Sequence, residues 1–318
     1  MLQNQQPFVV LTGPTAVGKT ELSIRLAKEI GGEIISADSI QVYKYMDIGS
    51  AKITKEEMDG VPHYLVDVLD PRDEFHIVKF QELAKEAMEE IYSHGHIPIL
   101  VGGTGFYIQG LLYDIDFSES DCDENYRENL EQLANEKGNE YLYEMLKEVD
   151  PESAEIIHLN NRKRVIRALE FYQQTGQKIS AHNERESKKD SPYLFEYFVL
   201  NRPRRELYER IDKRVEQMFA QGLVDEVRKL KEMGYTRDLV SMQGLGYKEV
   251  LAALAGEITL DEAKYLIKRD TRHFAKRQLT WFRREKSVTM IDYDKYDYNF
   301  EHILRFITTR LRERGIIQ

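Results

Sequence analysis

GPTAVGKT, residues 13–20, is the stretch of this sequence that decides its fold class. It matches the G-x-x-x-x-G-K-[ST] phosphate-binding loop, in which backbone amides and the positive end of the following helix surround a diphosphate. The apolar residues 7–11 before the loop predict a buried strand, and residues 21–30 after it predict a helix. This order of strand, loop and helix separates a phosphate-binding loop from an ordinary glycine-rich turn.

The residue types in the loop specify what it binds. Gly13 and Gly18 allow the backbone to curl so that successive amides point inward. The Lys19 ammonium can bridge two phosphates as they separate, and the Thr20 hydroxyl is placed to ligate Mg²⁺. The candidate diphosphate- or nucleotide-binding residues are Gly13, Pro14, Thr15, Ala16, Val17, Gly18, Lys19 and Thr20. The loop does not indicate which phosphate ester breaks.

The composition predicts a globular protein of 318 residues with two domains, or one domain with a large insertion. A single cysteine, Cys122, excludes a disulfide framework, and its acidic neighbours favour an incidental thiol. His63 and His76 lack metal-ligand spacing, which favours structural roles. The N-terminus has no basic region and no apolar stretch is long enough to span a bilayer, so we expect a cytoplasmic protein with no membrane partner.

The charge distribution bears on nucleic-acid binding. A formal net charge of -10 argues against a uniformly basic nucleic-acid binder. Residues 262–286, however, hold nine Lys or Arg against three acids, interleaved with aromatic side chains. This pattern indicates an RNA-binding face, but an amphipathic helix docked on the core would give the same pattern.

The first part of the chain alternates strands and helices. Further strands are expected at residues 31–38, 62–71 and 96–103, with a helix at 78–92. The alternation predicts an α/β fold, a P-loop NTPase-like parallel sheet flanked by helices. Ligands bind at the carboxyl ends of such strands, where Asp38, the GGTG turn with Thr104 and the phosphate loop should converge.

The middle of the chain changes to helical and highly charged sequence. We expect a helical insertion domain at residues 118–190, and a catalytic core made of residues 1–117 and 191–318 whose C-terminal part is helical. Within and around the insertion, helices are expected at 123–137, from 151 and at 161–176, an exposed loop at 183–192 and a strand at 194–201.

Two features bear on the chemistry of the cleft. Arg210 and Arg214, four residues apart on an expected helix, can clamp one phosphate group, or can form a solvated pair bridging to Glu206 or Asp212. The strand at 96–103 ends without the acidic residue that holds Mg²⁺ in motor ATPases, which weakens that interpretation. Asp38 can serve as a Mg²⁺ ligand, a cap or a base.

Taken together, these motifs closely resemble the bacterial tRNA dimethylallyltransferases. The resemblance runs from residue 8 to residue 286. The motifs that carry it are GPTAVGKT, SADSIQVYKYMDIGSAK, PHYLVDVLDP, VGGTGFYIQGLL, NRKRVIRALE, RPRRELYERIDKRVEQMFAQGLVDEV, QGLGYKE and FAKRQLTWFRRE. It implies transfer of a dimethylallyl group from dimethylallyl diphosphate to the exocyclic amine of the adenosine next to the anticodon, in tRNAs that read codons beginning with U.

The resemblance also implies roles for particular residues. Asp38 would be the catalytic base, with Thr104 and Arg210 as further catalytic residues, Arg214 at the diphosphate and Mg²⁺ as cofactor on Thr20. Arg277, Trp281 and Arg283 are weaker candidates for tRNA contact, and Trp281 is equally compatible with the core. The residues implied in tRNA binding are Asp38, Ser39, Ile40, Gln41, Thr104, Arg127, Arg162, Lys163, Arg164, Val165, Ile166, Gln243, Gly244, Leu245, Gly246, Tyr247 and Lys248. The expected partners are the tRNA anticodon stem-loop and dimethylallyl diphosphate, and we expect a monomer.

Three alternatives remain at this point. A small-molecule kinase would share the loop and sheet but gives no reason for the basic aromatic segment. An RNA-binding regulator without activity would not need Lys19, Thr20 and Asp38 together. Prenyl transfer to free adenosine nucleotides would not need the long insertion.

Overall fold

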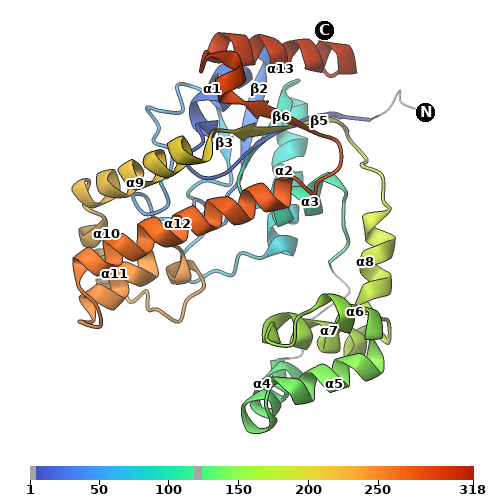
Figure 1. Ribbon diagram of the computed structural model, residues 1–318. Coiled ribbons are helices and arrows are strands. Elements are labelled where there is room, and N and C mark those ends of the chain that lie inside the picture. The colour runs from blue at the N-terminus through green and yellow to red at the C-terminus, as the bar shows by residue number, and fades with distance from the viewer. Residues whose placement is uncertain (1–4, 118–123) are drawn as a thin grey trace. The chain divides into compact units, whose positions relative to one another are not determined.

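The computed structural model describes residues 5–117 and 124–318, so Cys122 lies outside the described residues. The chain divides into two compact units. One consists of the chain up to Leu111 together with Pro192–Gln318, and the other of Leu112–Ser191. The first unit carries the sheet and the second is helical (Figure 1).

The sheet of the first unit is parallel throughout. Its six strands lie in the order β3-β2-β4-β1-β5-β6. All five neighbouring pairs are parallel, as the alternation of strands and helices predicted. The strands are β1 (Pro7–Thr12), β2 (Gly32–Ala37), β3 (His63–Tyr64), β4 (Ile97–Gly102), β5 (Leu194–Asn201) and β6 (Val288–Asp292). The predicted α/β fold class is confirmed.

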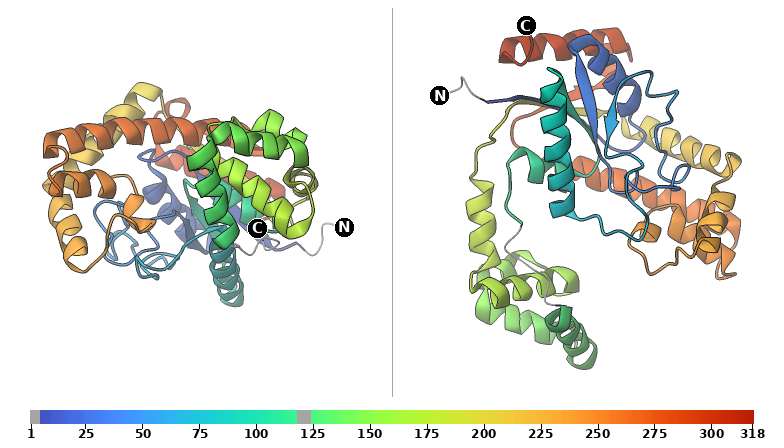
Figure 2. Two further views of the ribbon diagram at one scale, coloured as in Figure 1. Left: turned by 90° about the horizontal axis from the view of Figure 1, so that it is seen from below. Right: turned by 180° about the vertical axis from the view of Figure 1, so that it is seen from behind.

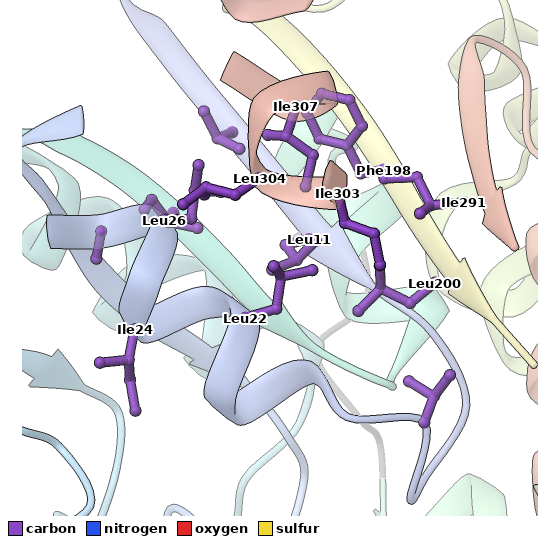
Figure 3. Packing of buried hydrophobic residues seen from close by; sticks show 14 of the residues in the cluster. Leu11, Leu22, Ile24, Leu26, Phe198, Leu200, Ile291, Ile303, Leu304 and Ile307 are labelled. Atoms are coloured by element: carbon purple, nitrogen blue, oxygen red, sulfur yellow. The ribbon is translucent and has the colours of Figure 1, made fainter. Parts of the chain in front are cut away.

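Helices cover both faces of this sheet. α1 (Lys19–Ile30) and α13 (Phe300–Arg314) pack on one face, where Leu11 of β1 lies among apolar side chains of both helices (Figure 3). α2 (Ile77–Ser93) packs on β2 and β4, and α3 (Gly105–Leu112) follows β4. Full burial of a Leu, Ile or Phe side chain contributes about 1.5 to 3 kcal/mol, so this core fixes β1 and the loop that follows it.

Two strand predictions differ from the structure. The third strand was expected at residues 62–71 but has only two residues, because Leu65 and Asp67 adopt positive φ angles of 60° and 61° that no strand accommodates. β6 was not expected, since residues after 201 were interpreted as mostly helical. It completes the sheet edge by pairing with β5.

The helices after β5 form a layered group beside the phosphate loop. α9 (Arg204–Ala220) and α12 (Leu260–Phe282) pack along each other, and α10 (Leu223–Glu232) and α11 (Tyr247–Leu254) extend the group (Figure 2). Leu207, Ile211 and Val215 form the buried face of α9 at helical spacing. Short 3₁₀ turns occur at Ser241–Gln243 and Tyr293–Tyr296.

The described residues of the second unit form five helices with their own apolar core. They are α4 (Glu124–Lys137), α5 (Asn139–Val149), α6 (Pro151–Ile156), α7 (Arg162–Thr175) and α8 (Ile179–Ser187). The buried Asp150 carboxylate accepts hydrogen bonds from the amide and hydroxyl of both Ser153 and Ser180, at 2.7 to 3.1 Å. The exposed loop expected at 183–192 is wrong in its first half, because α8 continues through residue 187 with Glu186 buried.

Candidate active site

The phosphate loop lies between β1 and α1 at the carboxyl edge of the sheet, where the sequence placed it. Gly13 and Gly18 have φ angles of 150° and 109°, which residues other than glycine rarely adopt. Lys19 Nζ donates to the carbonyls of Gly13 and Pro14 at 2.9 and 3.0 Å. Burial of this ammonium group, with a smaller effect from the nearby Arg214, lowers its pKa to about 8.

Both predicted arginines of α9 contact the loop. Arg210 Nε donates to the carbonyl of Ala16 at 2.7 Å, and Arg214 Nη1 donates to Thr15 Oγ1 at 3.4 Å. Asp212 pairs with another arginine, at 2.8 Å, so the alternative of a solvated pair bridging to this acid does not apply. Burial lowers the pKa of Arg214, and the nearby Asp38 carboxylate opposes this effect.

A third arginine, which the sequence analysis missed, supports the loop from behind. Arg202 Nε donates to the carbonyl of Val17 at 2.9 Å. Its guanidinium lies 3.9 Å from the centroid of the Tyr293 ring, in a cation–π arrangement, and its side chain is only 10% exposed. Because Tyr293 follows β6, the unexpected last strand helps to position the phosphate loop.

Asp38 lies directly after β2 and lines the cleft. Its Oδ1 accepts hydrogen bonds from the amides of Ile40 and Gln41 at 2.9 and 3.3 Å, so one oxygen caps a turn. Within residues 5–117 and 124–318, Oδ2 accepts no hydrogen bond. The carboxylate is close enough to raise the pKa of both Lys19 and Arg214 against the opposing effect of burial. Asp38 therefore combines a capping role with an oxygen that can accept a proton.

Gln278 of α12 joins the phosphate loop to the GGTG turn, and sequence reasoning missed it. Its Oε1 accepts from the Thr15 amide at 2.9 Å, and its Nε2 donates to the Gly103 carbonyl at 2.9 Å. A Cβ at Gly103 would lie 2.2 Å from Nε2, so this approach requires glycine. The Thr15 amide is therefore hydrogen-bonded within the protein. The Thr15 hydroxyl is the polar group of this residue that faces the cleft.

The cleft has two adjoining lobes, and Thr15, Asp38, Arg214 and Gln278 line both. The first, of about 460 Å³, is polar, and its further lining residues include Lys19, Thr20, Arg210 and Lys213. The second, of about 300 Å³, is more apolar, and its further lining residues include Ile211, Val215, Met218, Leu245 and Ile267. A charged group and a small apolar group can therefore be bound side by side.

One wall of the cleft is the segment 39–52, which a distant carboxylate holds in place. Glu226 of α10 accepts hydrogen bonds from the amides of Asp47, Ile48 and Gly49 at 3.0, 2.7 and 3.0 Å. It also accepts from the Tyr247 hydroxyl at 2.8 Å. Glu226 lies within the motif RPRRELYERIDKRVEQMFAQGLVDEV, but the motif indicates no role for this residue, because the three amides that it binds lie about 180 positions away.

Within this wall, Gln41 occupies a position on the polar lobe. Its Nε2 donates to the carbonyls of Ser50 and Ala51 at 3.3 and 3.1 Å. The amide nitrogen of Gln41 therefore braces the wall.

The residues implied in tRNA contact within the first unit divide into two groups. Those that line the apolar lobe are Ser39, Ile40, Thr104, Gly244, Leu245 and Lys248. Tyr247 differs from the expectation, because its side chain is fully buried on Glu226 and cannot touch an external ligand. Gln243 donates from Nε2 to the Arg237 carbonyl, and Gly246 provides the N-terminal cap of α11.

The implied residues of the helical unit also divide. Val165 and Ile166 belong to the core of this unit, at 1% and 2% exposure, so their side chains do not face a ligand. Arg127 forms two hydrogen bonds of 2.8 Å with the buried Glu170. Arg162 bonds Asn135, Asn139 and Glu131 at 2.8 to 3.3 Å. Lys163 and Arg164 are exposed.

The basic segment on α12 is partly neutralised within the protein. Lys264 and Lys268 pair with Glu216 of α9, and Arg272 pairs with Asp212. Arg277 and Arg283 form no ion pair with the described part of the chain. Trp281 packs so closely on the GGTG turn that a Cβ at Gly105 would lie 2.3 Å from its ring. The amphipathic-helix interpretation is therefore confirmed in that α12 is docked on the core, and the RNA-binding interpretation stays a prediction.

Known proteins similar to this chain point to one family. Residues 41–285 match a family model described as IPP transferase, and residues 7–73 match one described as isopentenyl transferase. A tRNA dimethylallyltransferase of Lachnoclostridium phytofermentans is 60% identical over 314 residues, covering 98% of this chain and 100% of the relative. The crystal structure of the full-length tRNA isopentenylpyrophosphate transferase from Bacillus halodurans has a TM-score of 0.73 and 44% identity, covering 98% of each chain. A eukaryotic dimethylallyltransferase acting on tRNA has a TM-score of 0.79 and 31% identity, covering 90% of this chain and 74% of that one.

Proposed function

The chain belongs to the tRNA dimethylallyltransferase family, and from that premise we propose how its cleft carries out the prenylation of tRNA. It is a prenyltransferase that modifies tRNA. The donor is dimethylallyl diphosphate, and the acceptor is the exocyclic amine of the adenosine that follows the anticodon in tRNAs reading codons that begin with U.

The observation that carries this proposal is the convergence of three cations on one phosphate loop, with the Asp38 carboxylate beside them. Lys19, Arg210 and Arg214 all bond groups of residues 13–16, and Asp38 lines the same cleft. A diphosphate fits the polar lobe because its charge would neutralise these cations. The adjoining apolar lobe suits a five-carbon allyl group, which a phosphate acceptor of a kinase would not require.

The cations act on the leaving group. The carbon–oxygen bond between the allyl carbon and the diphosphate breaks, and its electron pair goes to the diphosphate oxygen. Negative charge therefore builds at the phosphate loop in the transition state, where Lys19, Arg210 and Arg214 are already in place. Preorganised charge of this kind stabilises a transition state more than the ground state, which raises the rate of transfer.

Asp38 acts on the acceptor. The adenine amine is a weak nucleophile because its lone pair is delocalised, so a proton must leave as the nitrogen–carbon bond forms. Oδ2 of Asp38, which accepts no hydrogen bond within the described residues, would take that proton. A positioned general base of this type contributes about 10² to 10⁴ in rate. Thr104 lines the same lobe and would help to orient the base.

The residues at the polar lobe also fit a magnesium ion. Thr20 and Asp38 offer oxygen ligands there, and oxygen is the ligand type that Mg²⁺ prefers. Mg²⁺ held by Thr20 and the diphosphate would neutralise part of the leaving group's charge. The protein's own contribution is the set of cations that hold the diphosphate in place.

The acceptor base must leave its stack to reach the cleft. Ser39, Ile40 and Leu245 line the apolar lobe and would contact the extruded adenine, while the exposed Lys163 and Arg164 of the helical unit would contact RNA phosphates. We therefore assign tRNA contact to both the core and the helical unit. We further propose that the protein acts on tRNA as a monomer in the cytoplasm.

None of the helices in residues 5–117 and 124–318 is both long enough and apolar enough to cross a membrane.

The test is transfer of label from dimethylallyl diphosphate to an unmodified anticodon stem-loop in the presence of Mg²⁺. Asp38→Asn should lower transfer by about 10² or more while diphosphate binding is retained. The exposed Asp294→Asn is the matched control and should transfer normally. Label in free adenosine nucleotides but not in RNA, or phosphate transfer from ATP to a metabolite, would contradict the proposal.

A further inference from the structure

A second cluster of side chains that can bind a metal lies at the N-terminal ends of the parallel strands, opposite the catalytic cleft. Glu33 is in the second position of β2, His94 caps the C-terminus of α2, and His96 directly precedes β4. Asp38 follows the other end of β2, about 16 Å away along the strand. This cluster is therefore distinct from the catalytic cleft.

The geometry points to a divalent metal site formed by Glu33, His94 and His96, and we propose that it binds a zinc-like ion. Both imidazole Nδ1 atoms face the same carboxylate oxygen, Oε1 of Glu33, at 3.0 and 2.6 Å. One ligand atom from each residue lies within 4.8 Å of the others. Ligands bonded to one ion at about 2.1 Å lie roughly 3.0 to 3.4 Å apart, so the two distances from Nδ1 to Oε1 would lengthen by less than about 1 Å to admit an ion.

The surroundings of Glu33 resemble those of a metal-binding carboxylate. Its side chain is only 3% exposed, and its other oxygen, Oε2, accepts a hydrogen bond of 2.7 Å from the Tyr64 hydroxyl. Outer contacts of this kind fix the orientation of a ligating carboxylate. The two imidazoles are 45% and 46% exposed, so an ion can enter from solvent and retain water ligands.

The donor set selects the class of ion. Two imidazole nitrogens and one carboxylate oxygen suit Zn²⁺ and neighbouring late first-row divalent ions better than Mg²⁺, which prefers oxygen alone. The His-Gly-His spacing presents both rings from one short turn, in which Gly95 has a φ angle of 74°. Bound metal would tie the end of α2 and the start of β4 to β2, so its expected effect is on stability and not on prenyl transfer.

The site is tested with Zn²⁺ alone on chelator-stripped full-length protein, by isothermal titration and by anomalous scattering at the zinc edge. We expect one ion per chain at Glu33, and binding weakened roughly tenfold or more in each of His94→Ala and His96→Ala. His302→Ala, which removes an exposed imidazole on α13, should bind as the unmodified protein does.

Two outcomes would overturn the assignment. One is the absence of saturable one-to-one binding, which would leave the cluster as a carboxylate paired with two histidines. The other is equal affinity in His96→Ala and His302→Ala. Glu33→Gln adds a third variant, and because both histidines are exposed, their substitutions test the site even if that variant fails to fold. Transfer activity in Mg²⁺ should be retained in His94→Ala.

Discussion

Gln278→Leu removes a side chain that bonds both the phosphate loop and the GGTG turn. Leucine fills a similar volume but offers no polar atom, so the Thr15 amide and the Gly103 carbonyl lose their partner. Gln278 is only 7% exposed, which limits the access of replacement water. The variant therefore isolates the two hydrogen bonds from the packing of the side chain.

The size of the effect follows from the burial of each group. A buried donor or acceptor left without a partner costs about 1 to 3 kcal/mol. The bond to Gly103 is buried and the bond to Thr15 is partly buried, so we expect a loss of about 2 to 4 kcal/mol in the free energy of unfolding. Gln278→Glu should keep the hydrogen bond from the Thr15 amide. Its negative charge, however, would repel the Gly103 carbonyl oxygen and bound diphosphate.

The assay combines thermal unfolding with titration of inorganic diphosphate. Gln278→Leu should lower Tm by several degrees, and Gln278→Glu should weaken diphosphate binding more than Gln278→Leu does. Gln221→Leu, at an exposed position after α9, controls for the loss of a surface amide. If Gln278→Leu matches this control in both Tm and diphosphate affinity, the joining role of Gln278 is refuted.

Three further predictions concern charge, positioning and the helical unit. Because burial lowers the pKa of Lys19 to about 8 and bound diphosphate favours the charged form, diphosphate affinity should fall as pH rises above 8. Calorimetry between pH 8 and pH 10 checks this, and an affinity that does not fall over this range would count against a direct contact. Glu226→Ala should raise KM for the RNA acceptor roughly tenfold with little change in KM for the donor, because it removes the bonds that hold segment 39–52. Steady-state kinetics with each substrate varied in turn measure both KM values. Equal increases in the two KM values would indicate general misfolding. Asp150→Ala leaves four donors without an acceptor and should destabilise the helical unit by about 3 to 5 kcal/mol while the sheet stays folded. Hydrogen exchange should show faster exchange in the helical unit alone. Loss of protection in both units would contradict the independent folding of the helical unit.

The features predicted correctly are those that short stretches of chain determine. The phosphate loop follows from eight consecutive residues and their flanks, and β1, β2, β4 and β5 are apolar runs buried on both faces. Asn161 and Gly176 flank α7 at its predicted ends, with Gly176 in the left-handed conformation that terminates helices. In each case the signal and the structure lie in the same few residues.

The mistaken elements depend on contacts with the rest of the chain. β6 carries the mixed sequence VTMID and becomes a strand because the edge of β5 is available to pair with it. The charged run after residue 182 was expected to be a loop. Instead, Glu186 accepts a hydrogen bond from the Asp116 amide and pairs with Lys189, and these contacts hold the end of α8. Such long-range partners leave no local pattern.

The same reason explains which site residues were missed. Gln278, Glu226 and Arg202 all act through backbone groups distant in sequence, so their residue types alone carried no signal. The histidines at 94 and 96 do have a local signal, the His-Gly-His spacing, but their shared ligand Glu33 lies some 60 residues earlier. Only the fold brings these groups together.

The electrostatics of the cleft favour a departing anion even before substrate binds. Lys19 and Arg214 are withdrawn from water, and both have lowered pKa values because burial disfavours their charge. Asp38 opposes this effect on both groups, and Glu57 also opposes it on Arg214. The free protein still holds an excess of positive charge at the phosphate loop, because the polar lobe is lined by four cations and two acids: Lys19, Arg210, Lys213 and Arg214, against Glu21 and Asp38. A diphosphate relieves this cost, and it does so most fully when the carbon–oxygen bond has broken and the anion carries its largest charge. The arrangement that destabilises the free cleft thus lowers the barrier to bond cleavage, since no reorganisation of the cations is needed at the moment of transfer.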